Sequence, residues 1–274
     1  MARSINTARR ASSATGALRL RDVDDAAREV EADVHVYGQK VICETDSRGY
    51  ATPQNRSLTE IVVDASEGFI PLWDKSTTLR WRFQNRSIAL FEQPDAAKAK
   101  IKELLGKALL AWGDAAPVKF SQRDDAWDFE IVIREADRCN INGCVLASAF
   151  FPDSGRHRLT IYPKLFEQSA QEQMETLAHE IGHVFGLRHF FANLSETDFA
   201  SEIFGKHNPL TIMNYGNQSQ LTEDDRDDLK RLYQAVWSGT LTNINGTPIR
   251  LVKPFSSTGT VVGGPPILAA AALV

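Results

Sequence analysis

The spacing of apolar residues predicts three amphipathic helices. Between Asp95 and Trp112 apolar residues recur every three or four positions, which places them on one face of a helix. A second stripe follows Ser169 and Glu172, a pair typical of a helix N-terminus, and a third follows Thr222. We interpret all three stripes as core-facing, and their members are Ile101, Leu104, Leu105, Ala108, Leu109 and Trp112; Met174, Leu177, Ile181, Val184 and Phe185; and Leu229, Leu232, Tyr233 and Val236.

Five short segments have the pattern of β-strands. Residues 78–83 alternate between polar and apolar side chains, as in a strand with one buried face. The other four segments are residues 118–120, 129–133, 145–151 and 159–162. Near the C-terminus, Asn245-Gly246 predicts a hairpin within residues 240–253, and we expect the tail after Phe255 to be poorly ordered.

The composition is that of a soluble globular protein. The 274 residues are 43% hydrophobic and 24% charged, with a formal net charge of −4, so we expect no binding to nucleic acid or to a membrane surface. No segment is long and apolar enough to cross a bilayer. Residues 1–21 are basic and lack the apolar stretch of a secretory signal. We expect them to form a disordered tail, with a transit-like presequence as the alternative.

Residues 179–189, HEIGHVFGLRH, contain the strongest chemical signal in the chain. His179 and His183 are four positions apart, so a helix presents both imidazoles to the same metal ion. Gly186 can adopt the positive φ that ends a helix and turns the chain, which lets His189 approach the same ion. Three neutral imidazoles leave one position open on tetrahedral zinc, the arrangement of a catalytic site. Glu180 would face a water at that position as a general base.

These residues resemble the zinc-binding motif of the metzincin clan of endopeptidases. In that clan the motif is followed by a turn whose methionine lies beneath the metal without binding it, and Met213 in residues 211–216, TIMNYG, has that place. Tyr215 matches a tyrosine that astacins and serralysins use to stabilise the oxyanion, with an ordinary half-buried aromatic as the alternative. Phe190 after the last histidine makes the domain more similar to matrixins or serralysins than to astacins.

The resemblance implies an α+β zincin-type fold. We expect a mixed, twisted five-stranded sheet with two long helices above an active-site cleft, and a small irregular lower subdomain with the methionine turn and a C-terminal helix. This peptidase domain would span residues 72–237, preceded by an N-terminal segment, 22–71, and followed by a hairpin and flexible tail, 238–274. Ala147, Ser148 and Ala149 would form an edge strand that pairs with extended protein or peptide substrates.

The resemblance also implies one catalytic zinc. Where matrixins often carry a histidine for a structural zinc, this chain has Ser148. His35, His157 and His207 lack ligand spacing, so we interpret them as surface or hydrogen-bonded side chains. The sequence gives no argument for or against a structural calcium site. We expect a monomer, and the clan implies secretion although residues 1–21 do not resemble a signal peptide.

Many metzincins are inhibited by an N-terminal segment that places a cysteine or an aspartate on the zinc. Cys43 and Asp46 are the candidates here, with a buried thiol in a small subdomain as the alternative for Cys43. Cys139 and Cys144 flank a turn-prone tetrapeptide and could form a disulfide, which would leave Cys43 as the remaining thiol. In a reducing compartment all three would be thiols.

We therefore expect a zinc endopeptidase in which the three motif histidines hold the metal and Glu180 accepts the proton of water. The first alternative is a catalytically silent zinc-binding module that recognises peptides or proteins through the same cleft. The second is a thermolysin-like protease, in which Glu196 or Glu202 would replace His189 as the third ligand.

Overall fold

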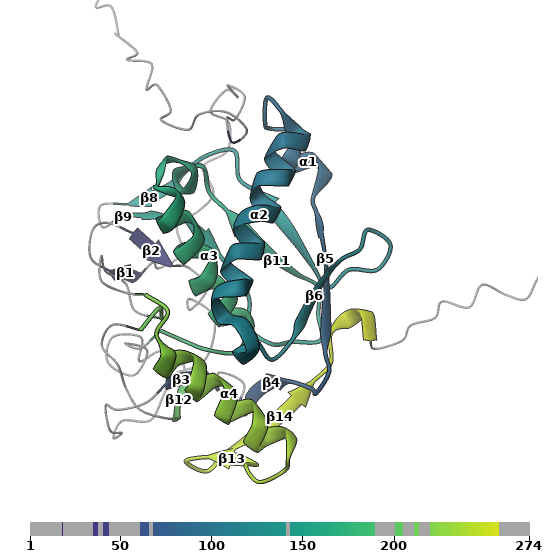
Figure 1. Ribbon diagram of the computed structural model, residues 1–274, viewed down its shortest axis with the longest axis vertical. Coiled ribbons are helices and arrows are strands. Elements are labelled where there is room, and N and C mark those ends of the chain that lie inside the picture. Colours follow the sequence, from purple (N-terminus) through teal and green to yellow (C-terminus); the bar gives the residue numbers. More distant parts are fainter. Residues whose placement is uncertain are drawn as a thin grey trace, which may run out of the picture.

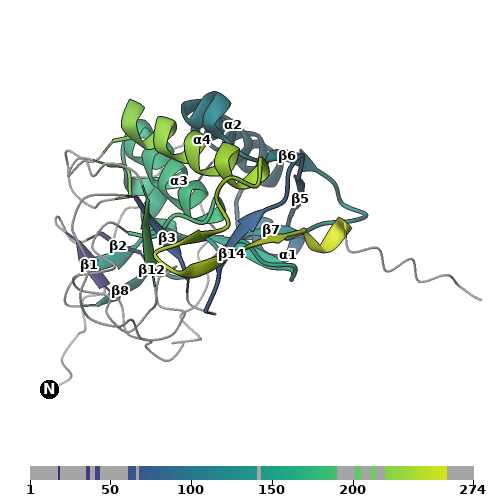
Figure 2. The same cartoon turned by 90° about the horizontal axis from the view of Figure 1, so that it is seen from below.

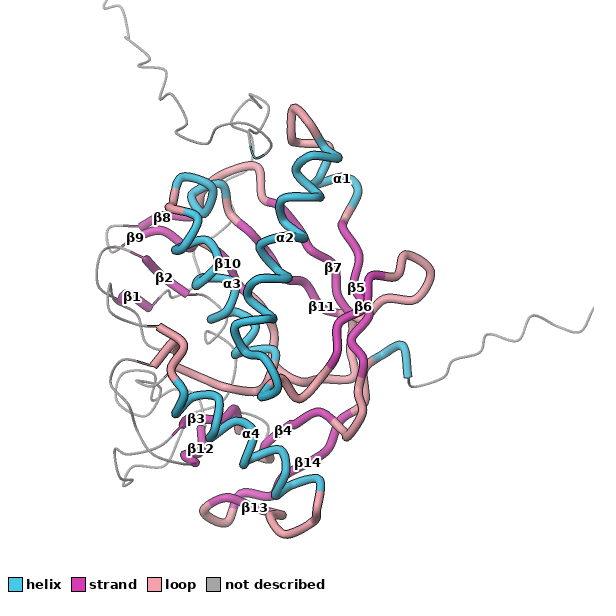
Figure 3. Tube along the Cα trace, in the orientation of Figure 1, coloured by secondary structure: helices cyan, strands magenta, loops and turns pink. Residues whose placement is uncertain are grey.

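A mixed five-stranded sheet forms the upper half of the protein (Figures 1 and 3). The computed structural model describes residues 18, 35–37, 41–43, 61–65, 68–140, 143–189, 201–204, 211–213 and 220–257. Four neighbouring strands run parallel, and the strand at one end is antiparallel to its neighbour, which confirms the predicted mixed sheet. In spatial order the strands are β10 (Ala147–Ser148), β11 (His157–Ile161), β7 (Phe129–Ile133), β5 (Thr78–Phe83) and β6 (Lys119–Gln122).

Two long helices, α2 (Pro94–Trp112) and α3 (Ala170–Val184), pack together on one face of this sheet (Figure 2). Trp112 Nε1 donates a hydrogen bond of 2.9 Å to the carbonyl oxygen of Ala178, and the Trp112 ring meets Phe185 edge-on. The contact joins the end of α2 to the middle of α3. The remaining short helices of the upper half are α1 (Asn85–Ile88), η3 (Gly113–Ala115) and η4 (Pro163–Glu167).

The lower half contains α4 (Glu223–Trp237) and a small sheet in the order β13-β14-β4. β4 pairs in parallel with β14, and β13 and β14 form a hairpin whose turn residues, Asn245 and Gly246, both have positive φ. The side chains of β4 are buried in the hydrophobic core that both halves share. The bounds are β4 (Ile70–Trp73), β13 (Asn243–Ile244) and β14 (Thr247–Val252), followed by the 3₁₀ turn η6 (Phe255–Ser257).

Strands from the N-terminal part of the chain pair with strands from its middle. One sheet has the order β1-β2-β9-β8 and another pairs β3 with β12. Leu18, which lies in the expected basic tail, is buried in the main core cluster, whereas the tail after residue 257 lies outside the described residues. In the part of the chain that the structure describes, no helix has the length and apolar character needed to span a membrane. These strands are β1 (His35–Tyr37), β2 (Val41–Cys43), β3 (Ile61–Asp64), β8 (Arg138–Asn140), β9 (Gly143–Val145) and β12 (Ser201–Phe204).

Candidate metal centre

Helix α3 carries the first two histidines of the motif, and a capping box sets its start. Ser169 Oγ accepts a hydrogen bond of 3.2 Å from the Glu172 N–H, and Glu172 Oε2 accepts one of 2.9 Å from the Ser169 N–H. These bonds satisfy N–H groups that have no partner within the first helical turn. His179 and His183 follow on the same face of the helix, and both are buried.

Three imidazole nitrogens converge at the end of α3. His179 Nε2 lies 3.1 Å from His183 Nε2 and 3.1 Å from His189 Nε2. Zinc–nitrogen bonds of about 2.0–2.1 Å in a tetrahedral site place two nitrogens about 3.3 Å apart. The spacing of the three nitrogens therefore fits a single zinc ion. Together with Cys43 Sγ, the ligand atoms all lie within 4.8 Å of one another.

Gly186 turns the chain so that His189 reaches the site. Its φ is +92°, a conformation that side chains with a Cβ rarely adopt. The Gly186 N–H donates to the His183 carbonyl at 2.8 Å, and the Leu187 N–H donates to the Gly182 carbonyl at 3.0 Å. This pair of bonds is a Schellman motif, which satisfies the last carbonyls of α3. A Cβ at Gly186 would also lie 3.1 Å from the Leu72 side chain, a close contact, but the positive φ is what favours glycine here.

Backbone carbonyls orient two of the histidine rings. His179 Nδ1 lies 2.7 Å from the Ile212 oxygen, and His183 Nδ1 lies 2.8 Å from the Leu187 oxygen. A carbonyl only accepts hydrogen bonds, so each Nδ1 must carry the proton. The lone pair of each Nε2 then points to the metal position, as in most protein zinc sites.

Met213 packs against α3 at Gly182, the residue before His183. It is buried, and its sulfur occupies the space that a Cβ at Gly182 would need. The Met213 N–H donates a hydrogen bond of 3.2 Å to Thr211 Oγ1, which closes the turn on itself. The same turn supplies, through the preceding residue Ile212, the carbonyl that orients His179.

Asp225 on α4 anchors this turn. Its carboxylate accepts hydrogen bonds from Thr211 Oγ1 and, at 3.4 Å, from the Ile212 N–H. It also accepts a hydrogen bond of 2.8 Å from the Thr222 N–H, and Thr222 Oγ1 accepts one from the Asp225 N–H, so the capping box of α4 is joined to the turn. Burial raises the pKa of the Asp225 carboxyl above its usual range, and the hydrogen bonds from Thr211 and Thr222 partly oppose that rise.

Cys43 enters the site from the N-terminal strand β2. Its Sγ lies 3.5 Å from His183 Nε2 and donates a hydrogen bond to Glu180 Oε1, also at 3.5 Å. Cys43 is fully buried, and Glu180 is almost so. β2 pairs in parallel with β9, with Val41 opposite Cys144 and Ile42 opposite Val145, which delivers the thiol to the histidines. Three imidazoles and one thiolate form a complete tetrahedral donor set for zinc.

Residues 72–234, more than half of the chain, match the family model described as Matrixin. The chain belongs to the matrixin family. The predicted resemblance is therefore confirmed, and the thermolysin-like alternative is wrong, since the three-histidine cluster is present. A search of curated proteins finds no match to this chain. The family implies protein substrates and a zinc-binding peptidase domain.

The matched residues include all three ligand histidines and Met213, but Cys43, β2 and β3 lie upstream of them. The matrixin domain thus receives its fourth candidate ligand from a part of the chain that the family model does not cover. Phe151, within the match, packs edge-to-face against the His183 ring, with the two ring centroids 5.5 Å apart.

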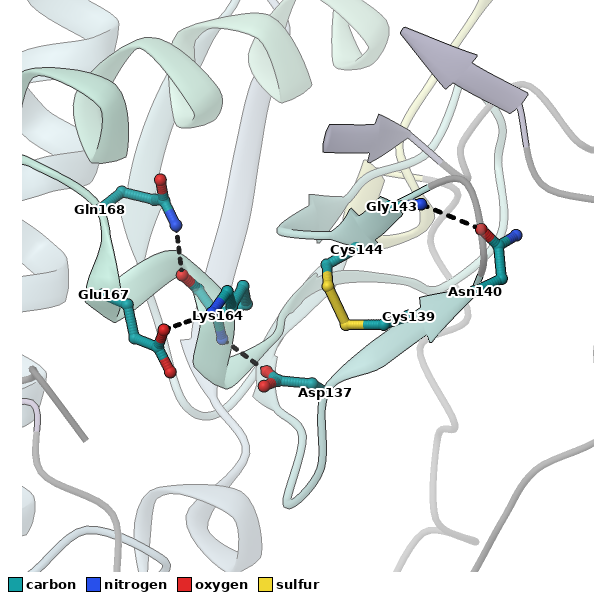
Figure 4. Close-up of a disulfide and its surroundings, with 8 residues drawn as sticks. All are labelled: Asp137, Cys139, Asn140, Gly143, Cys144, Lys164, Glu167 and Gln168. Atoms are coloured by element: carbon teal, nitrogen blue, oxygen red, sulfur yellow. Dashed lines mark hydrogen bonds and ion pairs between the residues drawn. A yellow bond between two sulfur atoms is a disulfide. The ribbon is translucent and has the colours of Figure 1, made fainter. Parts of the chain in front are cut away.

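A disulfide links β9, the strand that pairs with β2, to its other neighbour β8. Cys139 and Cys144 are bonded to each other and stand directly opposite on β8 and β9 (Figure 4). Asn140 Oδ1 accepts a hydrogen bond of 3.1 Å from the Gly143 N–H at the turn of this hairpin. Cys43 accordingly carries the remaining thiol of the three cysteines.

The residues predicted to pair with substrate lie at one end of the five-stranded sheet. Ala147 and Ser148 form β10, the end strand, and Ala149 follows it. Tyr215 and Asp46 lie outside the described residues, and so does His207. Within the described part of the chain, the cluster of Cys43 and the motif histidines is the single group of three or more potential ligands.

The prediction from sequence missed the groups that hold the ligands in place. Backbone carbonyls such as those of Ile212 and Leu187 carry no side-chain signal. Asp225 is recognisable in the sequence as the third residue of a capping box, but its second contact, with Thr211, depends on how α4 packs against the turn.

Proposed function

We propose that this matrixin domain is a zinc-dependent endopeptidase and that Cys43 keeps it latent in the full chain. The observation that carries the proposal is the position of the Glu180 carboxylate. It lies beside the Cys43 thiol, and that thiol adjoins the histidine nitrogens as a fourth ligand would. When the thiol leaves, the same carboxylate borders the position where a water would bind.

Zinc held by His179, His183 and His189 would supply a Lewis acid that lowers the pKa of water and polarises the scissile carbonyl. Glu180 would accept the proton of that water and later return it to the leaving amine. The carbonyls of Ile212 and Leu187 hold the two helix histidines in the tautomer that zinc requires. Tyr215 would donate a hydrogen bond to the developing oxyanion.

Cys43 would inhibit the domain in two ways. As a thiolate it would take the ligand position that water needs, and as a neighbour of Glu180 it would occupy the space in front of the general base. Its complete burial excludes water from both groups. We assign the inhibitory role to Cys43 rather than Asp46 because Cys43 belongs to the ligand cluster.

Substrates would bind as extended strands along β10. This strand stands at the end of the five-stranded sheet, and residues 147–149 supply backbone groups on that side. Backbone pairing is independent of side-chain identity, so we expect the peptidase to accept varied protein sequences. The domain would act as a monomer with one zinc.

The competing hypothesis is a silent zinc-binding module that only recognises peptides. Such a module needs the histidines but has no use for a buried carboxylate next to the fourth ligand. The presence of Glu180 at that place favours catalysis.

The test compares Glu180→Gln with its parent in a Cys43→Ser background, so that the thiol does not mask activity. We expect the Gln variant to keep one zinc per chain and to lose casein cleavage by about 10²–10⁴-fold, the usual contribution of a general base. Glu175→Gln on the same helix is the matched control and should cleave like the parent. Equal cleavage by the Glu180 variant would overturn the peptidase mechanism, and no cleavage by the zinc-loaded parent would favour the silent module.

A further inference from the structure

Strand β3 lies upstream of the matched domain, in the same N-terminal segment as Cys43, but its contacts are of a different kind. β3 pairs antiparallel with β12, and the register runs from Ser201 opposite Asp64 to Phe204 opposite Ile61. Among the described strands, β3 is the sheet partner of β12. Phe204 also packs against the core, so this pairing joins β3 and β12 to the body of the domain.

Val63 connects β3 to the metal helix. Its side chain is completely buried in the same core cluster as Ile181 and Leu187, and Ala65 just after the strand is buried there too. Val63 and Leu187 also form an isolated antiparallel bridge between their backbones. β3 therefore contacts the residue that follows the Gly186 turn.

Leu187 is the residue through which this contact reaches the metal site. Its carbonyl oxygen accepts the hydrogen bond from His183 Nδ1 at 2.8 Å, and its N–H is bonded to the Gly182 carbonyl at 3.0 Å. The backbone bridge to Val63 attaches Leu187 to a second element, strand β3, in addition to helix α3. Groups that hold the far nitrogen of a ligand histidine commonly change metal affinity by 10–100-fold when removed.

The two carbonyls that orient His179 and His183 are each held by a residue from another element. Ile212, which orients His179, is held by Asp225 from α4, and Leu187, which orients His183, is held by Val63 from β3. β4 continues this support, because Trp73 Nε1 donates a hydrogen bond of 2.6 Å to the Val184 carbonyl at the end of α3.

We propose that β3 is a permanent positioning strand of the catalytic unit and that the inhibitory element of the N-terminal segment ends between Cys43 and Ile61. Cys43 occupies the site, whereas β3 braces the carbonyl that orients one of the zinc ligands. Activation of the wild-type protein by proteolysis must then remove Cys43 with β2 and keep β3. The competent domain begins upstream of Ile61 and not at residue 72, where the family match starts.

The test uses two full-length, zinc-loaded proteins, each with one inserted recognition sequence for a sequence-specific protease. In the first the insertion lies between Cys43 and Ile61, and in the second between Ala65 and Gly68. After the cut, each protein is passed through a sizing column and assayed for zinc content, for fragment masses and for casein cleavage. We expect the first cut to yield a large fragment that starts before β3, holds one zinc and cleaves casein.

After the second cut, we expect the fragment that contains β3 to stay attached under native conditions and the protein to remain latent. When denaturant removes that fragment, we expect the zinc to be released. A one-zinc, active protein that lacks residues 1–65 would overturn the proposal. The zinc and mass measurements do not depend on catalysis, so they test the positioning role of β3 even if no form of the protein cleaves casein. A complete lack of casein cleavage would count against the proposed peptidase function, and only the activity assay depends on that function.

Point variants separate positioning from general stability. Val63→Ala and Val118→Ala, in a Cys43→Ser background, each shorten a buried valine of the same core, but Val118 precedes β6 and is not bridged to Leu187. We expect Val63→Ala to weaken zinc binding by about tenfold in competition with a chelator and to change the absorption spectrum of the cobalt-substituted protein. Val118→Ala should lower the melting temperature while leaving zinc affinity within about twofold. Equal zinc affinities in the two variants would refute a positioning role.

Discussion

The Cys43 thiol donates a hydrogen bond to Glu180 Oε1 across 3.5 Å, although the two residues are 137 positions apart in the chain. One side chain therefore covers the general-base candidate while also adjoining the metal ligand His183. In the proposed mechanism this contact would couple latency to catalysis, because any movement that frees the ligand position also uncovers the carboxylate.

Replacement of Cys43 by serine should activate the uncut protein. Serine is a much weaker zinc ligand than a thiolate, so water can compete for the fourth position. We expect casein cleavage by full-length Cys43→Ser to exceed that of the wild type by about 100-fold, equivalent to about 2.7 kcal/mol. The double variant Cys139→Ser/Cys144→Ser is the control for loss of cysteine and should stay latent. A Cys43→Ser protein as inactive as the wild type would contradict the blocking role.

Removal of zinc should expose the Cys43 thiol to labelling. A thiolate bound to zinc reacts slowly with thiol reagents, and Cys139 and Cys144 are protected by their disulfide. We expect less than one labelled thiol per native chain before chelation and one after it, measured by intact mass. Complete labelling of Cys43 in the zinc-loaded protein would show that Cys43 is not a ligand.

Gly182→Ala should damage the site, whereas Gly106→Ala should not. An added Cβ at Gly182 would overlap the Met213 sulfur and lie 3.3 Å from the Trp112 ring, so the buried Met213 side chain must move next to His183. We expect a loss of about 1–3 kcal/mol in the free energy of unfolding, together with weaker zinc binding. At Gly106 on α2 the new methyl group meets nothing within 4 Å, and alanine should stabilise the helix by about 0.5–1 kcal/mol. Urea unfolding of both variants measures the change in the free energy of unfolding relative to the wild type.

Asp225→Asn should weaken the methionine turn in a pH-dependent way. The amide replaces one acceptor oxygen that faces the donors Thr211, Thr222 and Ile212, which costs about 1–3 kcal/mol. Burial raises the pKa of Asp225 in the folded state, so the folded protein binds a proton more readily than the unfolded chain. The stability that this proton contributes is complete below the unfolded pKa and is lost as the pH rises through the folded pKa.

The stability advantage of the wild type over Asp225→Asn should therefore shrink as the pH rises above about 4, the ordinary pKa of an aspartate. Urea midpoints at a series of pH values measure this difference. Asp227→Asn, an exposed neighbour on the same helix, is the control and should show no such trend. A gap between wild type and Asp225→Asn that widens with pH would contradict the proposed cause.

Local patterns predicted the helices well. The stripes around Ile101, Ile181 and Leu232 correspond to α2, α3 and α4, because apolar spacing of three to four residues is a property of a single segment. Both predicted capping residues, Ser169 and Thr222, cap their helices. α2 starts at Pro94, one residue before the predicted start at Asp95, because the fixed φ of proline suits a first helical turn.

By itself the sequence determined the chemistry of the metal centre. The spacing of His179, His183, Gly186 and His189 is enough to predict a zinc site and a family, because a helix and one glycine turn place those side chains whatever surrounds them. Only the tertiary structure decided which distant groups complete that site. Cys43 reaches it through a parallel pairing of β2 with β9, and Val63 and Asp225 brace it from other elements. Each of these contacts joins different elements, whether the residues are 137 positions apart, like Cys43 and Glu180, or 13 apart, like Ile212 and Asp225. Such contacts depend on how whole elements pack, and no local period in the chain encodes that packing.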